Sequence, residues 1–475
     1  MEQPVRPGRA TAPGPAAAVE SPGPRPSPAA RRGWSAKVED GGAMPGRRRR
    51  AALVTAAVAL GGLGVGLLVG PGPAGAGPPG GRATWVTGWA GAPSGVTPVG
   101  LLGNTLRMSV PVDAPGTAVR VHLANTSVPG PTTFGHVTIG VAGAGPAVRA
   151  GTSRTVRFGG AGEVTVAGGA GRWSDPVAMV VRSGERLTVS VFGADAPWVT
   201  RVDDSTEVAA WSSGGGDRSA DASGAGFTTE RVAPWRVVDG IAVAAPRGWS
   251  TLVAFGDSIT AGYQDHQAAG HPTWPQLLAR RLDAGRASCR VSVVNEGISG
   301  NQLLPNGVAH FSGGPSGLSR LTRDALSQPG AREVVVQLGT NDISWDATHG
   351  VAGGVGQLER AYRALVAAAH ARGVRVVAAT LTPAGDPAHP TSFVGGYSTP
   401  AGDAGRAAVN RWIRTAHAFD AVTDFARAVR SRADHDRLAR WADSGDHLHP
   451  STRGDAAMAG AVERAAVSGC PGSGR

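Results

Sequence analysis

Four short segments in the last 225 residues contain the side chains that could do chemistry. They are Phe255–Thr260 (FGDSIT), Asn295–Gly300 (NEGISG), Gly339–Asp342 (GTND) and Asp446–Pro450 (DHLHP). A serine hydroxyl becomes a nucleophile when a base removes its proton, and a histidine oriented by a carboxylate is a common base. Ser258, His449 and Asp446 supply these groups, in the order Ser, Asp, His along the chain. The segments therefore predict acyl transfer, with Ser258 attacking a carbonyl.

Acyl transfer also needs hydrogen-bond donors directed at the oxyanion that forms on the carbonyl oxygen. The candidates are the backbone N–H groups of Ser258 and Gly300 and the side-chain amide of Asn341. Each has a simpler explanation, because Gly, Asp and Ser are common turn residues and Asn often caps a helix. The presence of all four segments in one chain favours catalysis. We expect Asp257 to brace its own turn, and Asp342 to cap or pair rather than react.

The elements that would position these residues begin near Ser250. Five apolar runs with strand character alternate with helical stretches: 252–255, 291–294, 334–338, 374–378 and 421–425. In the helical stretch 358–369, apolar residues recur at i, i+3 and i+4, which predicts one buried face formed by Leu358, Ala361, Tyr362, Leu365, Val366 and Ala369. This alternation predicts a parallel sheet covered by helices on both sides. Three of the four segments directly follow a predicted strand, at the edge where such sheets bind ligands.

The preceding region, from Thr84 to about Ala245, has a period of two. Apolar and polar residues alternate in short runs separated by Gly, Pro, Asp and Ser: 105–110, 119–123, 137–141, 164–166, 187–191 and 235–243. This pattern predicts an antiparallel sandwich or jelly roll. Six tryptophans lie here, at positions 85, 89, 173, 198, 211 and 235. They fit either the core of a small β domain or an exposed platform for glycans.

From about Thr251 to Ala466 the chain resembles the SGNH, or GDSL-type, hydrolases. The four residues that define that family correspond to Ser258, Gly300, Asn341 and His449, with Asp446 as the acid partner. The resemblance implies a flavodoxin-like three-layer α/β/α fold and hydrolysis of carboxylic esters without metal or cofactor. A β-sandwich ahead of this domain is similar to exported bacterial members grouped with acetyl-xylan esterases. We therefore expect a β domain over 82–247 and a hydrolase domain over 248–470.

Composition and missing motifs exclude other classes. The 475 residues exceed what one hydrophobic core usually holds. The formal net charge is +11, and the first 50 residues alone contribute +6, so the rest has no basic stripe that would indicate a nucleic-acid partner. The chain contains no GxSxG elbow, no HExxH and no cysteine pair at zinc spacing. No metal or cofactor is therefore expected.

The N-terminal part predicts export. Residues 1–43 have the composition of a disordered or untranslated segment, and 44–76 combine an arginine run, an apolar stretch and small residues. Residues 44–76 fit a cleaved signal peptide. Alternatively they fit a membrane anchor with the protein facing outside, because a helix over the apolar run of 19 residues would be about 29 Å long, just enough to cross a bilayer core. Cys289 and Cys470 would form a disulfide in an exported chain, or would both stay unpaired.

The combined prediction is an exported serine esterase that acts through an acyl-enzyme. Its substrates would be short-chain or acetyl esters, on small molecules or on polysaccharide. The alternative is a cell-wall or glycan-binding protein whose hydrolase domain is idle. The oligomeric state is left open by the sequence.

Overall fold

The structure is a computed structural model that describes residues 83–97, 99–203, 209–230, 236–263, 271–285, 289–304, 313–349, 354–385, 395–464, 467 and 470. The predicted disordered or untranslated segment (1–43) and the predicted signal peptide or anchor (44–76) lie outside these ranges. Among the helices within them, none has the length and hydropathy that a membrane span requires. All of the structure described below belongs to one compact unit.

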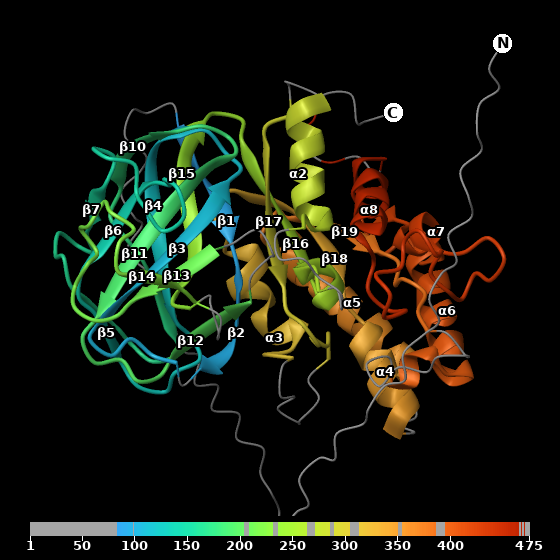
Figure 1. Ribbon diagram of the computed structural model, residues 1–475. Helices are drawn as coiled ribbons and strands as arrows, with labels where there is room; N and C mark the ends of the chain where they lie inside the picture. Colours follow the sequence, from blue (N-terminus) through green and yellow to red (C-terminus); the bar gives the residue numbers. More distant parts are fainter. Residues whose placement is uncertain are drawn as a thin grey trace, which may run out of the picture. The chain divides into compact units, whose positions relative to one another are not determined.

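The first part of this unit is all β and is called the β domain (Figure 1). Its strands are β1 (Ala83–Ala90), β2 (Ala92–Thr97), β3 (Asn104–Val112), β4 (Gly116–Asn125), β5 (Thr132–Phe134), β6 (Val137–Val141), β7 (Arg154–Val156), β8 (Val164–Val166), β9 (Ala170–Trp173), β10 (Val177–Val181), β11 (Glu185–Gly193), β12 (Val199–Asp203), β13 (Ala209–Ser213), β14 (Phe227–Thr229) and β15 (Val238–Pro246).

Two antiparallel sheets form the body of the β domain. One has the order β1-β15-β4-β10, with β9 also paired to β4, and the other has the order β14-β13-β3-β11-β6-β7. Alternate residues of β3 and β4, such as Leu106, Met108 and Val121, lie in one hydrophobic core that both sheets share. This arrangement is the sandwich that the period of two predicts. Trp89 is buried, Trp198 is half exposed, and Trp235 lies outside the described residues.

The second part, called the α/β domain, contains a five-stranded parallel sheet and the helices that cover it. Its strands are β16 (Ser250–Gly256), β17 (Val291–Gly297), β18 (Ala331–Gln337), β19 (Arg375–Ala379) and β20 (Ala421–Thr423). Its helices are α1 (Ser258–Ala261), α2 (Trp274–Gly285), α3 (Gly317–Leu321), α4 (Thr340–His349), α5 (Gly354–His370), α6 (Pro400–Thr415), α7 (Phe425–Val429) and α8 (Thr452–Arg464). A π-helical turn (Thr322–Leu326) and a 3-10 turn (Gly395–Ser398) complete it.

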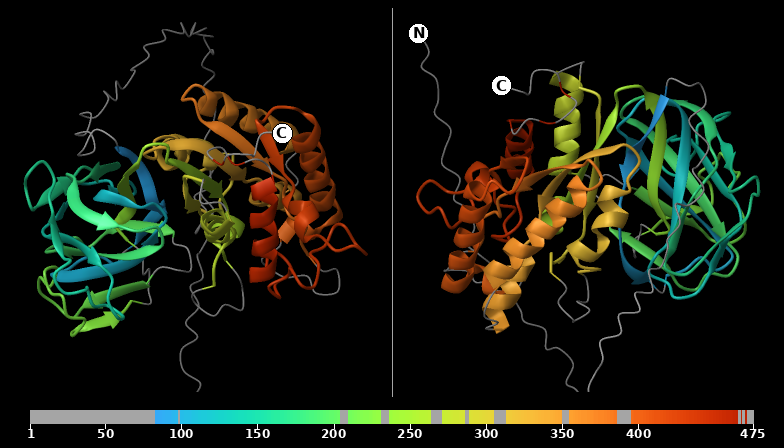
Figure 2. Two further views of the ribbon diagram at one scale, coloured as in Figure 1. Left: turned by 90° about the horizontal axis from the view of Figure 1, so that it is seen from above. Right: turned by 180° about the vertical axis from the view of Figure 1, so that it is seen from behind.

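The strand order β17-β16-β18-β19-β20 is the flavodoxin-like order 2-1-3-4-5. The side chains of β16 alternate between two cores, with Val253 and Phe255 on the side of α5 and α6, and Leu252 and Ala254 on the side of α2 and α8. Figure 2 shows helices on both faces of this sheet. The predicted three-layer α/β/α fold is therefore confirmed. In α5 the buried residues are the six that the apolar spacing predicts.

The two domains follow each other closely in the chain and are joined by hydrogen bonds. Residues 247–249 alone separate β15 from β16. Thr87 of β1 donates its N–H to the Thr251 hydroxyl at 3.0 Å, and its carbonyl accepts from the Ser292 hydroxyl at 2.6 Å. Both partners lie at the amino ends of their strands in the α/β domain. This contact therefore lies at the edge of the sheet opposite to the predicted active site.

A disulfide closes the α/β domain near its C-terminus. It joins Cys289, which directly precedes β17, to Cys470, which follows α8. The two cysteines are 181 residues apart in the sequence. The bond therefore ties the C-terminal segment to the start of β17, which is an edge strand of the sheet.

Candidate active site

The turn that carries Ser258 is shaped by its neighbours in the sequence. β16 ends at Gly256, where a Cβ atom would lie 2.1 Å from the Thr260 hydroxyl, so only glycine fits. Asp257 then caps α1, because its Oδ1 accepts the N–H of Ile259 at 3.0 Å. Ser258 is thereby the first residue of a helix that starts at the carboxyl edge of the sheet. Its N–H is among the helix-start groups that have no partner within the helix.

Three of the predicted residues form one hydrogen-bonded chain. The Ser258 hydroxyl and Nε2 of His449 are 2.8 Å apart, and Nδ1 of His449 is 2.5 Å from Oδ2 of Asp446. The imidazole thus donates through Nδ1 to the carboxylate, which leaves Nε2 to accept the serine proton. Both His449 and Asp446 are buried, and the ring of Tyr263 lies 4.7 Å from that of His449. This geometry allows Ser258 to be deprotonated by His449.

Asp446 is held in place as an anion. Its Oδ1 accepts the N–H groups of Leu448 at 2.9 Å and His449 at 2.8 Å. Burial alone would raise the pKa of Asp446, but the hydrogen bond to His449, the charge of that ring and the two N–H groups together lower it to about 2. The carboxylate is therefore ionised at neutral pH, when it can stabilise a protonated His449.

Backbone and side-chain hydrogen bonds bring the predicted oxyanion donors to the same edge. The N–H of Ile298 donates to the carbonyl of Gly256 at 3.1 Å, which joins the second segment to the serine turn. The Asn341 amide donates to the carbonyl of Asn301 at 2.9 Å, which joins the third segment to the second. Gly300 has φ of +74°, a conformation that favours glycine. The donors thus lie on segments that are bonded to one another around Ser258.

Two acidic residues of the motifs have supporting roles. Asp342 accepts the N–H groups of Leu303 and Leu304, both at 2.9 Å, and burial raises its pKa to about 6. Burial also raises the pKa of Asp257, to about 7, and the nearby charge of Asp342 adds to this effect while the N–H of Ile259 opposes it. Asp257 braces its own turn, as predicted. Asp342 neither caps a helix nor forms an ion pair among the described residues; its side chain instead holds the backbone of Leu303 and Leu304.

Arg320 is a residue of the site that the sequence does not reveal. It is buried, and its guanidinium donates to the carbonyl of Gly256 at 2.9 Å, the carbonyl of Glu296 at 2.9 Å and Oδ1 of Asn301 at 3.0 Å. It also pairs with Asp324 at 3.2 Å. Arg320 therefore ties the end of the nucleophile strand to the segment that contains Gly300. A single arginine in a helical stretch gives no sequence signal for such a role.

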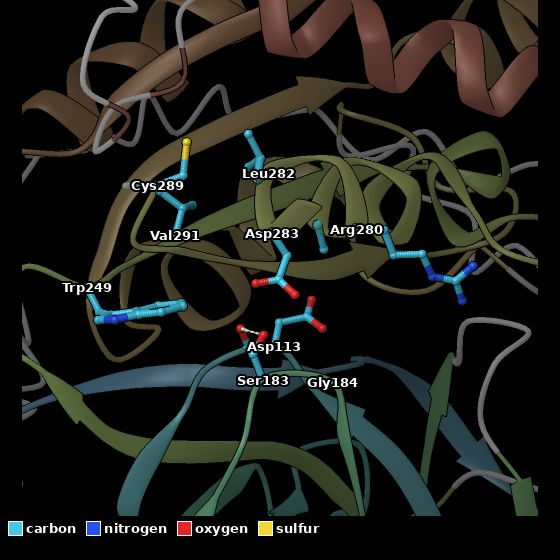
Figure 3. A pocket seen from close by; sticks show the side chains of 10 residues that line it. Asp113, Ser183, Gly184, Trp249, Arg280, Leu282, Asp283, Cys289 and Val291 are labelled. Carbon is cyan, nitrogen blue, oxygen red and sulfur yellow. Dashed lines mark hydrogen bonds between the residues drawn. The ribbon is translucent and has the colours of Figure 1, made fainter. Parts of the chain in front are cut away.

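Other candidates lie apart from this constellation. His271 is partly buried just before α2, whereas His266 lies outside the described residues. A separate cavity, shown in Figure 3, is lined by Asp113 and Ser183 of the β domain and by Asp283 of α2, among others, and includes none of the predicted catalytic residues. Within the described ranges, no three His, Cys, Asp or Glu side chains are placed to hold a metal ion.

The fold and the site define an α/β hydrolytic enzyme with a serine at the carboxyl edge of a flavodoxin-like sheet. Residues 254–457 match the family model described as the GDSL-like lipase/acylhydrolase family. This domain belongs to that family, as its motifs predict, and the protein is accordingly a carboxylic ester hydrolase. No curated protein matches the chain.

Several solved structures are similar to part of the chain. An aryl esterase from M. smegmatis is 17% identical, with a TM-score of 0.34, and the match covers 45% of this chain and 96% of that one. An acetylxylan esterase from Geobacillus stearothermophilus is 19% identical, with a TM-score of 0.33, over 47% of this chain and 97% of that one. A GDSL-like lipase from Bacteroides thetaiotaomicron is 18% identical, with a TM-score of 0.33, over 46% and 87%.

Proposed function

We propose that the protein is an exported serine esterase that hydrolyses short-chain or acetyl esters through an acyl-enzyme. The observation that carries this proposal is the hydrogen-bonded chain from Ser258 through His449 to Asp446. Burial and two backbone N–H groups keep the carboxylate in place, so the base is oriented before substrate arrives. The substrate would be a small-molecule ester or an esterified polysaccharide.

In the first half of the reaction, the Ser258 oxygen attacks the ester carbonyl while Nε2 of His449 takes the hydroxyl proton. The negative charge that forms on the carbonyl oxygen is stabilised by the N–H groups of Ser258 and Gly300 and by the Asn341 amide. Removal of one such donor costs about 10²–10³ in kcat in serine hydrolases. The tetrahedral intermediate then collapses, the C–O bond to the alcohol breaks, and His449 gives its proton to the leaving alcohol.

In the second half, water replaces the alcohol. The water oxygen attacks the acyl-enzyme carbonyl while His449 takes a proton from the water. The same donors stabilise the second tetrahedral intermediate. Collapse of this intermediate releases the acid and returns the proton to the Ser258 oxygen. Asp446 stays ionised throughout and stabilises the imidazolium form of His449.

The test is hydrolysis of p-nitrophenyl acetate by the full chain and by the Ser258→Ala variant. Where deacylation is the slower step, we expect a burst of p-nitrophenol equal to the enzyme concentration. Mass spectrometry should then find one acetyl group, about 42 Da, on the peptide that contains Ser258. The variant should lose at least about 10³-fold in kcat. Activity that survives the substitution would place the nucleophile elsewhere.

The acyl preference is tested separately with p-nitrophenyl esters of increasing chain length and with acetylated xylan. The sequence has no long apolar lid segment, which supports a preference for short acyl groups. We expect kcat/KM to be highest for acetate and to fall for long chains. A maximum at long acyl chains would refute this part of the proposal and leave the catalytic roles intact.

Export is supported by the signal-like segment 44–76 and by the disulfide between Cys289 and Cys470, because disulfides persist in oxidising compartments. The test is to express the full chain in a bacterial host and to sequence the N-terminus of the protein found in the medium. A new N-terminus near residue 77 supports cleavage, and full-length protein in the membrane fraction supports the anchor. Protein that stays in the cytoplasm would refute export.

A further inference from the structure

A carboxylate of the β domain reaches the segment that contains Gly300. β12 ends at Asp203, and Oδ2 of this residue accepts the N–H of Ser299 at 2.9 Å. Ser299 belongs to the α/β domain and directly precedes Gly300. We call residues 298–301 the oxyanion loop. One hydrogen bond therefore links a strand of the β domain to the loop that would hold the developing oxyanion.

Asp203 is itself held by groups of the β domain. Its Oδ1 accepts the Ser94 hydroxyl at 2.6 Å, and the Ser94 oxygen accepts Nε of Arg201 at 3.0 Å. The Arg201 guanidinium also lies 3.5 Å from the Asp203 carboxylate. Ser94 is on β2 and Arg201 is on β12, and these strands pair with each other. The carboxylate is thus fixed by the paired strands before it meets Ser299.

Removing the Asp203 carboxylate from water costs free energy, which its hydrogen bonds and its ion pair with Arg201 partly offset. Burial raises the pKa of Asp203, and Arg201, the Ser94 hydroxyl and the Ser299 N–H each act in the opposite direction. A buried carboxylate contributes little net stability compared with an apolar side chain of similar size. Its value here is that it provides a strong acceptor at a defined position. That acceptor is directed at a backbone N–H next to the oxyanion donor.

The rest of the oxyanion loop is fixed from within the α/β domain. The N–H of Ile298 donates to Gly256 and that of Asn301 donates to Ile298, both at 3.1 Å. The Asn301 side chain donates to the carbonyls of Gly313 and Pro315. Within the described part of the chain, the N–H of Gly300 has no hydrogen-bond acceptor. Gly300 therefore lies between residues whose N–H groups are bound, with its own N–H left for substrate.

We propose that Asp203 is a positioning residue that orients the oxyanion loop, so that the β domain completes the active site. This inference rests on the proposed function, because it assigns Gly300 to the oxyanion hole. The bond to Ser299 sets the peptide plane that precedes Gly300. Loss of the acceptor lets this peptide plane rotate, so the Gly300 N–H no longer points at the oxyanion. The transition state then loses more stabilisation than the bound substrate does.

The experiment compares the wild type with Asp203→Ala and Asp203→Asn in the full chain. The control variant Thr251→Val removes a contact between the two domains at the opposite edge of the sheet and keeps the bond to Ser299. For each protein we measure kcat and KM with p-nitrophenyl acetate per titrated active site, inhibition by an alkyl boronic acid, and the melting temperature.

We expect Asp203→Ala to lower kcat by about 10–100-fold with KM changed less than threefold, and to weaken boronate inhibition by a similar factor. Asp203→Asn keeps one acceptor oxygen and should lie between Asp203→Ala and the wild type. Thr251→Val should lower the melting temperature and leave kcat within about threefold of the wild type. If Asp203→Ala does not fold, Asp203→Asn is compared with Thr251→Val in the same way.

Two kinds of failure are distinguishable. Wild-type activity that does not depend on Ser258 refutes the proposed function and this inference together. Activity that depends on Ser258 but keeps its kcat in the Asp203 variants refutes only the positioning role. A kcat loss of equal size in Thr251→Val would also overturn it, because the effect would then come from loosening the two domains in general.

Discussion

Substitution of Asp257 by Asn is expected to make the protein more stable at neutral and alkaline pH. Asp257 is completely buried behind Ser258, and its pKa is raised from 3.8 to about 7, first by burial and then by the charge of Asp342. The folded state therefore holds a proton on this carboxyl between pH 4 and 7, where the unfolded state has lost it. Ionisation in the folded state then costs stability as the pH rises through this window.

The magnitude follows from the shift. A rise from 3.8 to about 7 is about 3 pH units, and each unit corresponds to about 1.4 kcal/mol. The carboxyl thus removes about 4 kcal/mol from the free energy of unfolding at pH 8, and less than about 1 kcal/mol at pH 4. Asn has no charge to bury, and its amide oxygen can still accept the N–H of Ile259. The variant should therefore keep the cap of α1.

The assay is urea unfolding of wild type and variant from pH 4 to pH 8, followed by far-UV circular dichroism. The difference in the free energy of unfolding, variant minus wild type, should become more positive by about 3–4 kcal/mol between pH 4 and pH 8. Contributions of other groups cancel to first order in this difference. Hydrolysis of p-nitrophenyl acetate checks that the serine turn is intact. A difference that is flat with pH, or that falls as pH rises, would refute the assignment of a raised pKa to Asp257.

Two further substitutions test the supports of the site. Arg320→Met should lower the free energy of unfolding by about 3–5 kcal/mol, because it leaves the buried Asp324 without one of its cations and removes three hydrogen bonds to the site. A loss below about 1 kcal/mol in urea unfolding would contradict this prediction. Gly300→Ala and Gly373→Ala both place alanine at a positive φ, so each should cost about 1 kcal/mol in stability. Only Gly300→Ala should also lower kcat, by tenfold or more, and equal kcat values for the two variants would exclude a role of Gly300 at the oxyanion.

Much of the fold could be predicted because its signals are local. The apolar spacing in α5 identifies its buried face residue by residue, and the strand–helix alternation identifies a parallel sheet. The predicted strand at 421–425 is wrong at its end, since β20 stops at Thr423 and Phe425 begins α7. The reason is a helix cap: the Asp424 side chain accepts the N–H of Arg427 and starts the helix there.

Some residues of the candidate site are identified by short local motifs, and others only by contacts with residues distant in the sequence. Ser258, Asp446 and His449 could be nominated because their motifs are short and their chemistry is specific. Arg320 and Asp203 could not, because their partners are remote: Arg320 bonds Gly256, 64 positions away, and Asp203 bonds Ser299, 96 positions away. An arginine in a helix and an aspartate at a strand end are ordinary surface residues by pattern. Only the packed structure shows these two contacts.

The short junction between β15 and β16 has a consequence for how such proteins can be recombined. Only residues 247–249 lie between the two strands, and Thr87 and Asp203 on one side bond Thr251 and Ser299 on the other. A gene fusion at this junction would give the α/β domain a new neighbour without these partners. We therefore expect the two domains to be inherited as a pair. A relative without the β domain would need another acceptor for the amide that Asp203 binds here.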